Sequence, residues 1–408
     1  MRALVISDTH LGAWTGEDLL RERANLDLLE PHLEVDEVIV LGDMFDFLFG
    51  SMADAFDAAT GLLDLLRKKL QGKRLVFLAG NHDHHLVTRD REARLELQLV
   101  GQPQRPDDRA VVELDPVYRL LERRLEGVEV DFRYPTYTFG DVLCTHGHYL
   151  DVHAQRAGSG IDRLLGDAVW RIAVGSQHSP SVDDYEATTT LLTELLFTIA
   201  RVPNGTNTEM SVYRSFALLG QAVRGVNAPR RALEAVARSA GERLRAASSG
   251  NREHGARREA DTYNRARSHE AERRRRTHAP AGGEASSFVF ARRTHPSDPT
   301  EAAVAAIDQV VTNLGWADHT DKIVFAHTHQ PLDGVLDPSG KRRYWNTGSW
   351  IYEPDLTSPR AYMAYLHNAW PGTAVLIDTD RSQPQLLRLR EHLNPLNALH
   401  DSRARSND

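Results

Sequence analysis

The chain of 408 residues has a single cysteine, Cys144, and no long hydrophobic run. One cysteine excludes a disulfide within the chain and is typical of a reducing compartment. No apolar segment approaches the roughly 18–20 residues that a membrane-spanning helix needs. Residues 3–6 already have the character of a strand, which leaves no room for a signal peptide before them. We therefore expect a cytoplasmic protein, and peripheral contact with a membrane stays open.

An excess of positive charge is also lacking, because the formal net charge is −8. This balance argues against a protein that coats nucleic acid nonspecifically, although a local basic patch could act against the total. Nucleic acid is therefore not an expected partner. The length is sufficient for a sizeable core in one large domain with insertions or in two domains. The oligomeric state cannot be read from the sequence.

Five short apolar segments each run into polar residues of the kinds that bind metal. The segments are residues 3–6, 38–41, 75–78, 141–144 and 323–325, and they read as strands of a buried sheet. The polar residues that follow them are Asp8 and His10, Asp43 and Asp46, Asn81, His82 and Asp83, His146 and His148, and His327 and His329. Parallel strands place ligand sites at their carboxyl ends, so we expect these groups to converge.

The spacing inside these strand ends suits metal binding. Residues two apart in an extended chain point the same way, so Asp8 and His10 can address one point in space. Asn81 offers a neutral oxygen, and the adjacent Asp83 could fix the tautomer of His82. Each fragment alone could instead be a turn with solvated side chains. Five strand ends of the same kind favour a site.

Helical periodicity appears in two parts of the chain. The segments with this pattern are residues 15–33, 51–70, 117–125, 161–174, 188–202, 212–223, 232–244 and 301–314, and further strands are expected near 361–366 and 374–377. We predict a discontinuous catalytic domain, residues 1–150 and 317–394, around a helical insert, residues 151–316. The polar tail, residues 395–408, is expected to fray.

Residues 248–286 within the insert are rich in arginine and nearly free of aliphatic side chains. Such a composition predicts a disordered loop or a solvated helix. Acidic residues are interleaved with the arginines, which favours a solubilising linker over a basic arm that binds anionic lipid or nucleic acid.

The ordered motifs resemble the signature of the calcineurin-like metallophosphoesterases. The matching elements are Asp8-x-His10, Gly42-Asp43-x-x-Asp46, Gly80-Asn81-His82-Asp83, His146 and His327-x-His329. The resemblance implies an α/β fold, a four-layer αββα sandwich of two mixed sheets with a helical insertion. It also implies one metal held by Asp8, His10, Asp43 and His329, and a second held by Asp43, Asn81, His146 and His327, with Asp43 bridging. Ala326 stands where the family usually has glycine.

The implied activity is hydrolysis of a phosphomonoester, phosphodiester or pyrophosphate bond. Nitrogen and carboxylate ligands without thiolate suit two divalent transition-metal ions, manganese first, with iron, zinc or nickel as alternatives. We expect a hydroxide bound to both metals to attack phosphorus. His82, oriented by Asp83, is expected to act as the general acid.

Within this superfamily the motifs resemble most the UDP-2,3-diacylglucosamine pyrophosphatase-like group. That group carries arginine where this chain has His82, and aspartate where it has His148. One alternative is a DNA nuclease of the repair-exonuclease branch, in which the last two histidine motifs are close together; here about 180 residues separate His146 from His327. The other alternative is a noncatalytic metal-bound scaffold.

Overall fold

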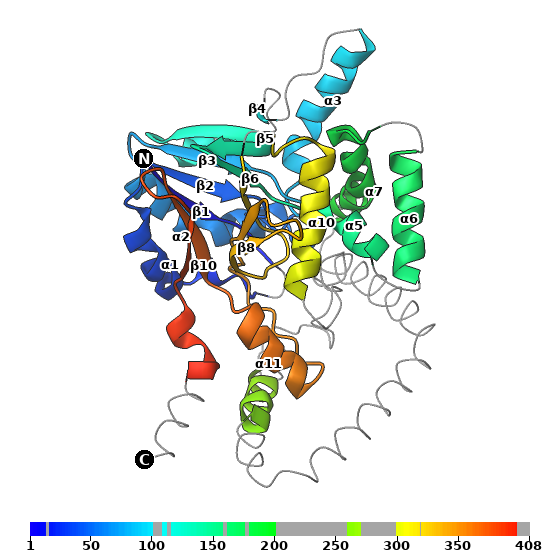
Figure 1. Cartoon of the computed structure of the whole chain (residues 1–408). Helices are drawn as coiled ribbons and strands as arrows, with labels where there is room; N and C mark the ends of the chain where they lie inside the picture. Colours follow the sequence, from blue (N-terminus) through cyan, green and yellow to red (C-terminus); the bar gives the residue numbers. More distant parts are fainter. Residues whose placement is uncertain are drawn as a thin grey trace, which may run out of the picture. The chain divides into compact units, whose positions relative to one another are not determined.

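The computed structural model describes residues 1–13, 16–100, 108–111, 116–157, 161–175, 179–200, 259–270, 299–318 and 320–397. The chain divides into two compact units (Figure 1). The first unit comprises residues 1–203, 290–352 and 369–392, and the second comprises 204–289, 353–368 and 393–408. All the strand ends that carry candidate metal ligands belong to the first unit.

The first unit is built on one mixed sheet of eleven strands. The strands are β1 (Arg2–Ile6), β2 (Glu37–Leu41), β3 (Arg74–Leu78), β4 (Asp108–Ala110), β5 (Glu129–Phe139), β6 (Val142–Thr145), β7 (Lys322–Phe325), β8 (Leu332–Leu336), β9 (Arg343–Asn346), β10 (Thr373–Asp378) and β11 (Gln385–Arg388). They pair in the order β11-β10-β1-β2-β3-β5-β6-β7-β9-β8, and β4 pairs with β5.

The long strand β5 makes this sheet continuous. Its first residues pair in parallel with β3, and its last four pair antiparallel with β6 across a hairpin. The expected four-layer sandwich of two separate sheets therefore differs from the structure, which has one large, nearly closed sheet. The reason is the length of β5, whose 11 residues are enough to pair with both neighbours in turn. The α/β class itself is confirmed.

Two groups of parallel strands carry the candidate ligands. β1, β2 and β3 are parallel neighbours, and so are β6, β7 and β9. The core residues of β1, β2 and β3, such as Val5, Ile39 and Val76, are fully buried, as their continuous apolar sequences predict. The strand predictions at 3–6, 38–41, 75–78, 141–144, 323–325 and 374–377 are confirmed as β1, β2, β3, β6, β7 and β10.

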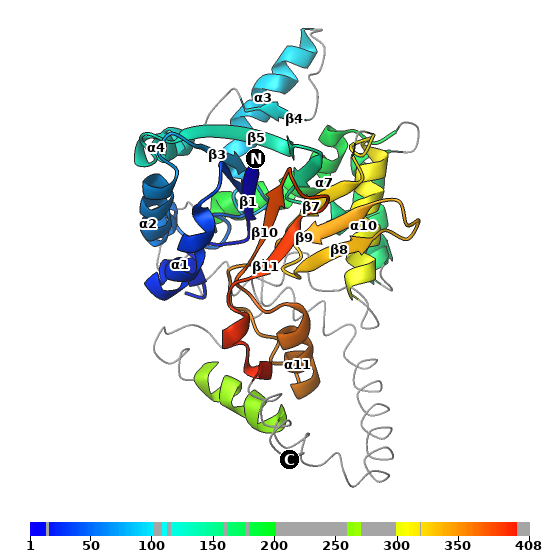
Figure 2. The ribbon, with the colours of Figure 1, turned by 60° about the vertical axis from the view of Figure 1, so that its left-hand side comes forward.

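The helices of the first unit pack on its sheet or on one another (Figures 1 and 2). They are α1 (Arg23–Leu29), α2 (Met52–Lys69), α3 (His85–Leu99), α4 (Pro116–Arg124), α5 (Leu150–Ala157), α6 (Ile161–Ala173), α7 (Val182–Ala200) and α10 (Pro299–Asn313). α5, α7 and α10 share a buried core with β6, β7 and β9 through residues such as Tyr185, Ile307 and Phe325. The helical insert therefore packs directly on the strands that carry His146 and His327.

The predicted helices of the insert that fall on described residues are all present. The patterns at 161–174, 188–202 and 301–314 correspond to α6, α7 and α10. The patterns at 212–223 and 232–244 lie outside the described residues, as do 398–408 of the tail. The domain boundaries expected from the sequence stay a prediction.

Two secondary-structure predictions are wrong. The segment expected as a strand near 361–366 is the helix α11 (Pro359–Asn368). Pro359 suits the first position of a helix, and the Ser358 hydroxyl accepts the Ala361 N–H, which caps it. The buried Tyr362, Tyr365 and Leu366 follow helical spacing rather than alternation.

The single helix expected over residues 15–33 is three short pieces instead. A 3-10 turn (Leu19–Arg21), α1 and a second 3-10 turn (Glu30–Leu33) follow one another, with extended backbone at Glu22 and a proline in the last piece. The Asp18 side chain, just before the first 3-10 turn, accepts the Gly12 N–H at 2.9 Å and makes no cap hydrogen bond to the turn.

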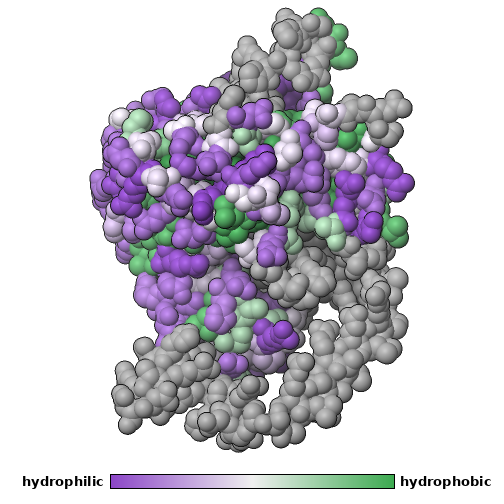
Figure 3. Space-filling model, viewed as in Figure 1, coloured by the Kyte–Doolittle hydropathy of each residue, from purple (hydrophilic) through white to green (hydrophobic). Residues whose placement is uncertain are grey.

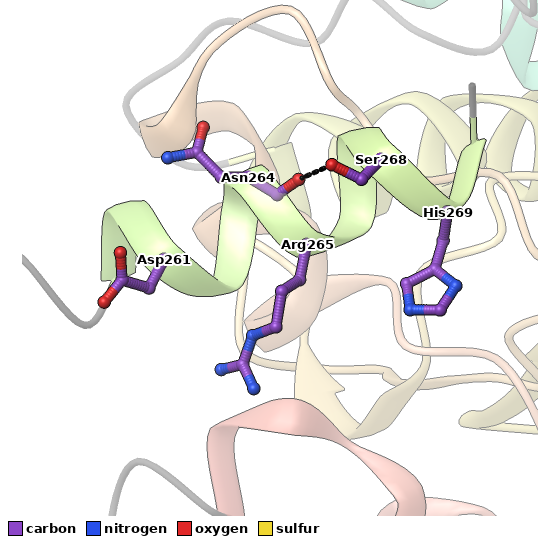
Figure 4. Close-up of a pocket in the computed structure, with 5 residues that line it drawn as sticks. All are labelled: Asp261, Asn264, Arg265, Ser268 and His269. Carbon is purple, nitrogen blue, oxygen red and sulfur yellow. Dashed lines mark hydrogen bonds between the residues drawn. The ribbon is translucent and has the colours of Figure 1, made fainter. Parts of the chain in front are cut away.

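In the second unit, residues 259–270 of the arginine-rich stretch form a helix. The Tyr263 hydroxyl of this helix donates to the Leu356 carbonyl at 3.0 Å. A pocket of about 560 Å³ is lined by Asp261, Asn264, Arg265, Ser268 and His269, which project from the helix (Figure 4). The rest of residues 248–286 lies outside the described part, so the linker and basic-arm interpretations stay predictions.

In the described part of the chain, no helix is both long and apolar enough to cross a membrane. On the face shown in Figure 3, polar residues cover most of the coloured surface and hydrophobic residues form small separate areas.

Candidate metal centre

One half of the centre joins the ends of β1 and β7. The Nε2 atoms of His10 and His329 lie 3.2 Å apart. Asp8 Oδ1 lies 3.2 Å from His329 Nε2 and 3.9 Å from His10 Nε2. These three side chains come from segments more than 300 residues apart, and their donor atoms are close enough to share one ion. His329 is the most exposed of them, at 25% of its side chain.

The other half joins the ends of β2, β3, β6 and β7. His146 Nε2 lies 3.1 Å from Asn81 Oδ1 and 3.3 Å from Asp43 Oδ2. The Nδ1–H of His146 donates to the Leu41 carbonyl at 2.9 Å. That bond leaves Nε2 facing the oxygens of Asn81 and Asp43, so a proton or a shared cation has to lie between Nε2 and these oxygens. His327 belongs to the same group of mutually close donor atoms.

Asp43 lies between the two halves. Its Oδ2 is 3.3 Å from His146 Nε2 and 3.9 Å from His10 Nε2. Its Oδ1 accepts the backbone N–H of His82 at 2.7 Å. One oxygen of the carboxylate is thus fixed by the backbone, and the other faces a histidine from each half. The bridging role that the resemblance implies for Asp43 stays a prediction.

Among the described non-glycine residues, positive φ occurs only at candidate ligands, and at five of the seven. Five such residues have positive φ: Asp8 (47°), His10 (44°), Asp43 (51°), His327 (69°) and His329 (57°). The left-handed region costs a residue with a side chain of order 1–3 kcal/mol, so these loops do not adopt it for their own stability. Strain of this kind concentrates where side chains must be held in place for function.

Two glycines make room for His146. A Cβ on Gly80 would lie 2.2 Å from Asp43 Oδ1 and 2.7 Å from His146 Nε2, and one on Gly42 would lie 2.4 Å from His146 Nδ1. Atoms cannot approach that closely, so only glycine fits at either strand end.

His82 is oriented by a different carboxylate from the one expected. Its Nδ1–H donates to Asp46 Oδ1 at 3.1 Å, and its ring packs edge-on against His10 with centroids 4.4 Å apart. The Asp83 carboxylate instead accepts backbone N–H groups at the ends of β2 and β3, among them Gly80 at 2.6 Å and Met44 at 2.9 Å. Asp83 therefore holds the two loops together, and the prediction that it orients His82 is wrong.

Electrostatic coupling shifts several of these groups. Burial alone would raise the pKa of Asp43, but His146 and His82 outweigh it and hold the pKa well below its ordinary value. Burial would lower the pKa of His82, yet the carboxylates of Asp43 and Asp46 raise it to about 9. Burial, reinforced by His82, lowers the pKa of His10 to about 4. His10 is therefore neutral at physiological pH, the form in which histidine binds metal.

The donor set fits divalent metal. Asp8 Oδ1 is buried and makes no hydrogen bond of good geometry, and the imidazoles that face it, His329 at 3.2 Å and His10 at 3.9 Å, are themselves candidate ligands, so a cation shared with them would compensate its burial. Imidazole nitrogens with carboxylate oxygens suit transition metals. One ion fits among Asp8, His10 and His329, and another among Asp43, His146 and His327.

Two buried acids from the insert were not singled out in the sequence. Asp151 in α5 accepts a hydrogen bond from His327, as detailed below. Glu186 in α7 accepts from His84 Nε2 at 2.7 Å and from the hydroxyls of Tyr134 and Tyr149, with Arg91 at 3.4 Å. Neither acid follows a strand, so the pattern that revealed the other residues could not reveal these.

His148 lies between the group around Glu186 and the metal centre, because its ring is 6.1 Å from that of His84 and 5.5 Å from that of His146 between centroids. One donor atom each of His84, His148 and Glu186 lies within 4.8 Å of the others. Because four donors already surround the Glu186 carboxylate, hydrogen bonds account for its burial. We interpret this group as a structural contact between the insert and the strand ends.

The family model of the calcineurin-like phosphoesterases matches residues 1–198. A search of curated proteins finds no match for the chain. The family match supports this superfamily and, with the donor groups above, a metal-dependent hydrolase of phosphoester bonds. It ends before His327 and His329, which the fold brings to the same centre. The more specific resemblance to the UDP-2,3-diacylglucosamine pyrophosphatase-like group stays a prediction.

Proposed function

We propose that the chain hydrolyses a phosphomonoester, phosphodiester or pyrophosphate bond at a dinuclear metal centre. The observation that carries this proposal is the position of Asp43 Oδ2 between histidines of two donor groups. A single metal site would not need a shared carboxylate of this kind. Manganese is the first candidate ion, with iron, zinc or nickel as alternatives.

The residues of the centre have distinct roles in this proposal. Bound divalent ions supply an activated water and positive charge for the phosphoryl oxygens. Asp8, His10, Asp43 and His329 would hold one ion, and Asp43, Asn81, His146 and His327 the other. The glycines at positions 42 and 80 leave the space that the His146 ring occupies beside Asp43.

His82 is the proposed general acid. Its Nδ1–H is held by Asp46, so Nε2 is the atom that can give a proton to the leaving oxygen. The edge-on contact with His10 keeps the ring beside the donor group that contains His329. Proton donation by a positioned side chain is typically worth about 10²–10⁴ in rate.

The proposal is tested with the full-length chain stripped of metal by a chelator. Mn²⁺, Zn²⁺ and Fe²⁺ are restored separately, and hydrolysis of 4-nitrophenyl phosphate, its bis ester and a pyrophosphate diester is measured. We expect turnover with at least one metal, none in the stripped protein, and none in Asp43→Asn. Asp308→Asn is the matched control, because Asp308 bonds Arg342 and Tyr344 away from the centre.

Two other outcomes would favour the alternative functions. No turnover with any metal would refute the proposal and favour the noncatalytic scaffold. Hydrolysis of DNA by protein that leaves the model diester intact would favour the nuclease branch.

A further inference from the structure

Asp151 connects the helical insert to the candidate metal centre. It is the second residue of α5, and only 6% of it is exposed. Its Oδ1 lies 2.9 Å from Nε2 of His327, which is 176 residues away in the chain. No motif of the sequence links these two residues, so the contact exists only because α5 packs beside the end of β7.

This contact decides which nitrogen of His327 can bind a metal. A carboxylate oxygen only accepts, so the Nε2 atom of His327 carries the proton and Nδ1 is left as the ligand atom. The backbone N–H of His327 also donates to Asp8 Oδ2 at 3.2 Å. Asp151 therefore holds the His327 ring at Nε2, and Asp8 in the other half of the centre holds the His327 backbone.

His146 follows the same rule with a different acceptor. Its Nδ1–H donates to the Leu41 carbonyl, which leaves Nε2 toward Asp43. The two histidines of this half thus each have one nitrogen held by an acceptor outside the centre. Such partners typically affect metal affinity by about 10–100-fold.

Asp151 acts through His327 rather than as a ligand itself. Within the described residues, the group of mutually close donor atoms at this half contains Asp43, His146 and His327 but not Asp151. Asp151 is also anchored, because its backbone N–H donates to the His148 carbonyl at 3.2 Å. Its neighbours Leu150 and Val152 are buried in the core between the insert and the sheet. The carboxylate is therefore held in a fixed place.

We propose that Asp151 is a positioning residue of the metal centre, which holds His327 by Nε2 so that Nδ1 faces the ion shared with Asp43 and His146. The proposal rests on the proposed function, because it takes His327 to be a metal ligand. In this proposal α5, the first helix of the insert, contributes a residue that supports the metal centre. Removal of the helix, or of this one carboxylate, should weaken metal binding without a change in any ligand.

The experiment measures metal binding and not activity. Metal-stripped full-length wild-type protein, Asp151→Ala, Asp151→Asn, His327→Ala and the double variant Asp151→Ala/His327→Ala are titrated with Mn²⁺ in competition with a chromogenic chelator. The control is Asp167→Ala, because Asp167 lies in the next helix and accepts from Arg156 at 3.0 Å without touching a histidine. Circular dichroism shows whether each variant is folded.

We expect Asp151→Ala to weaken one of two Mn²⁺ sites by about 10–100-fold. Asp151→Asn keeps an oxygen acceptor, so it should recover most of that loss. In the His327→Ala background, removal of Asp151 should have no further effect, since the two residues act together. A purely structural role would not give this pattern.

Three results would overturn the proposal: wild-type affinity in folded Asp151→Ala, equal losses in the alanine and asparagine variants, or full additivity in the double variant. Failure of the proposed function is a separate result. Protein that binds Mn²⁺ in the expected order but hydrolyses no ester would refute the function and leave the role of Asp151 intact.

Discussion

Replacement of His82 by alanine tests whether the chain has a general acid. The Nδ1–H of His82 donates to Asp46 at 3.1 Å, so only Nε2 can reach a substrate. Loss of the acid should slow hydrolysis of an alkyl phosphate by about 10²–10⁴, which corresponds to about 3–5 kcal/mol in the barrier. With 4-nitrophenyl phosphate the loss should stay within about tenfold, because 4-nitrophenolate leaves without a proton.

The assay compares kcat/KM for the two esters in wild type, His82→Ala and a control, His32→Ala. His32 is a partly exposed histidine in the second 3-10 turn, and it belongs to none of the groups of mutually close donor atoms among the described residues. Metal content is measured for each protein, so that loss of metal is not mistaken for loss of the acid. Equal losses on the two esters, with metal content unchanged, would refute the acid role of His82.

Two further predictions concern carboxylates. Asp43→Asn should lose both metal ions, which metal analysis would show, and two retained ions in this variant would contradict the bridging role of Asp43. Asp46→Asn should keep both ions but hydrolyse esters with poor leaving groups more slowly, which the two-ester assay would show. For Glu186, burial would raise the pKa, but His84 and Arg91 outweigh it and lower the pKa below its ordinary value. Its stabilisation is therefore present above the unfolded-state pKa of about 4.3 and is lost as pH falls through the folded-state pKa. Glu186→Gln should cost about 3–5 kcal/mol of unfolding free energy at pH 7, and denaturant titrations should show that difference shrinking below pH 4; a constant difference would refute the charge argument.

The sequence by itself determined the strand ends and their polar residues. β1, β2, β3, β6 and β7 are continuous apolar runs buried on both faces, and that pattern is local. The residues that follow them are fixed by the chain within a few positions. Their types and order also sufficed to indicate the superfamily that the match over residues 1–198 supports.

The tertiary structure decided which of these groups meet. Asp83 is next to His82 in the chain and Asp46 is 36 residues away, and only the path of the loops shows that Asp46 accepts from the ring while Asp83 binds backbone N–H groups. The continuity of the sheet depends on where β5 pairs along its length. Neither choice has a signature within a short window of sequence.

The same reason explains why Asp151 and Glu186 were missed. Acidic side chains are normally exposed, and nothing in the sequence beside these two marks them as buried. Asp151 reaches His327 across 176 residues, and Glu186 reaches His84 across 102. Spacing along the chain fixes only local geometry, whereas contacts over such distances are set by the packing of α5 and α7 on the sheet.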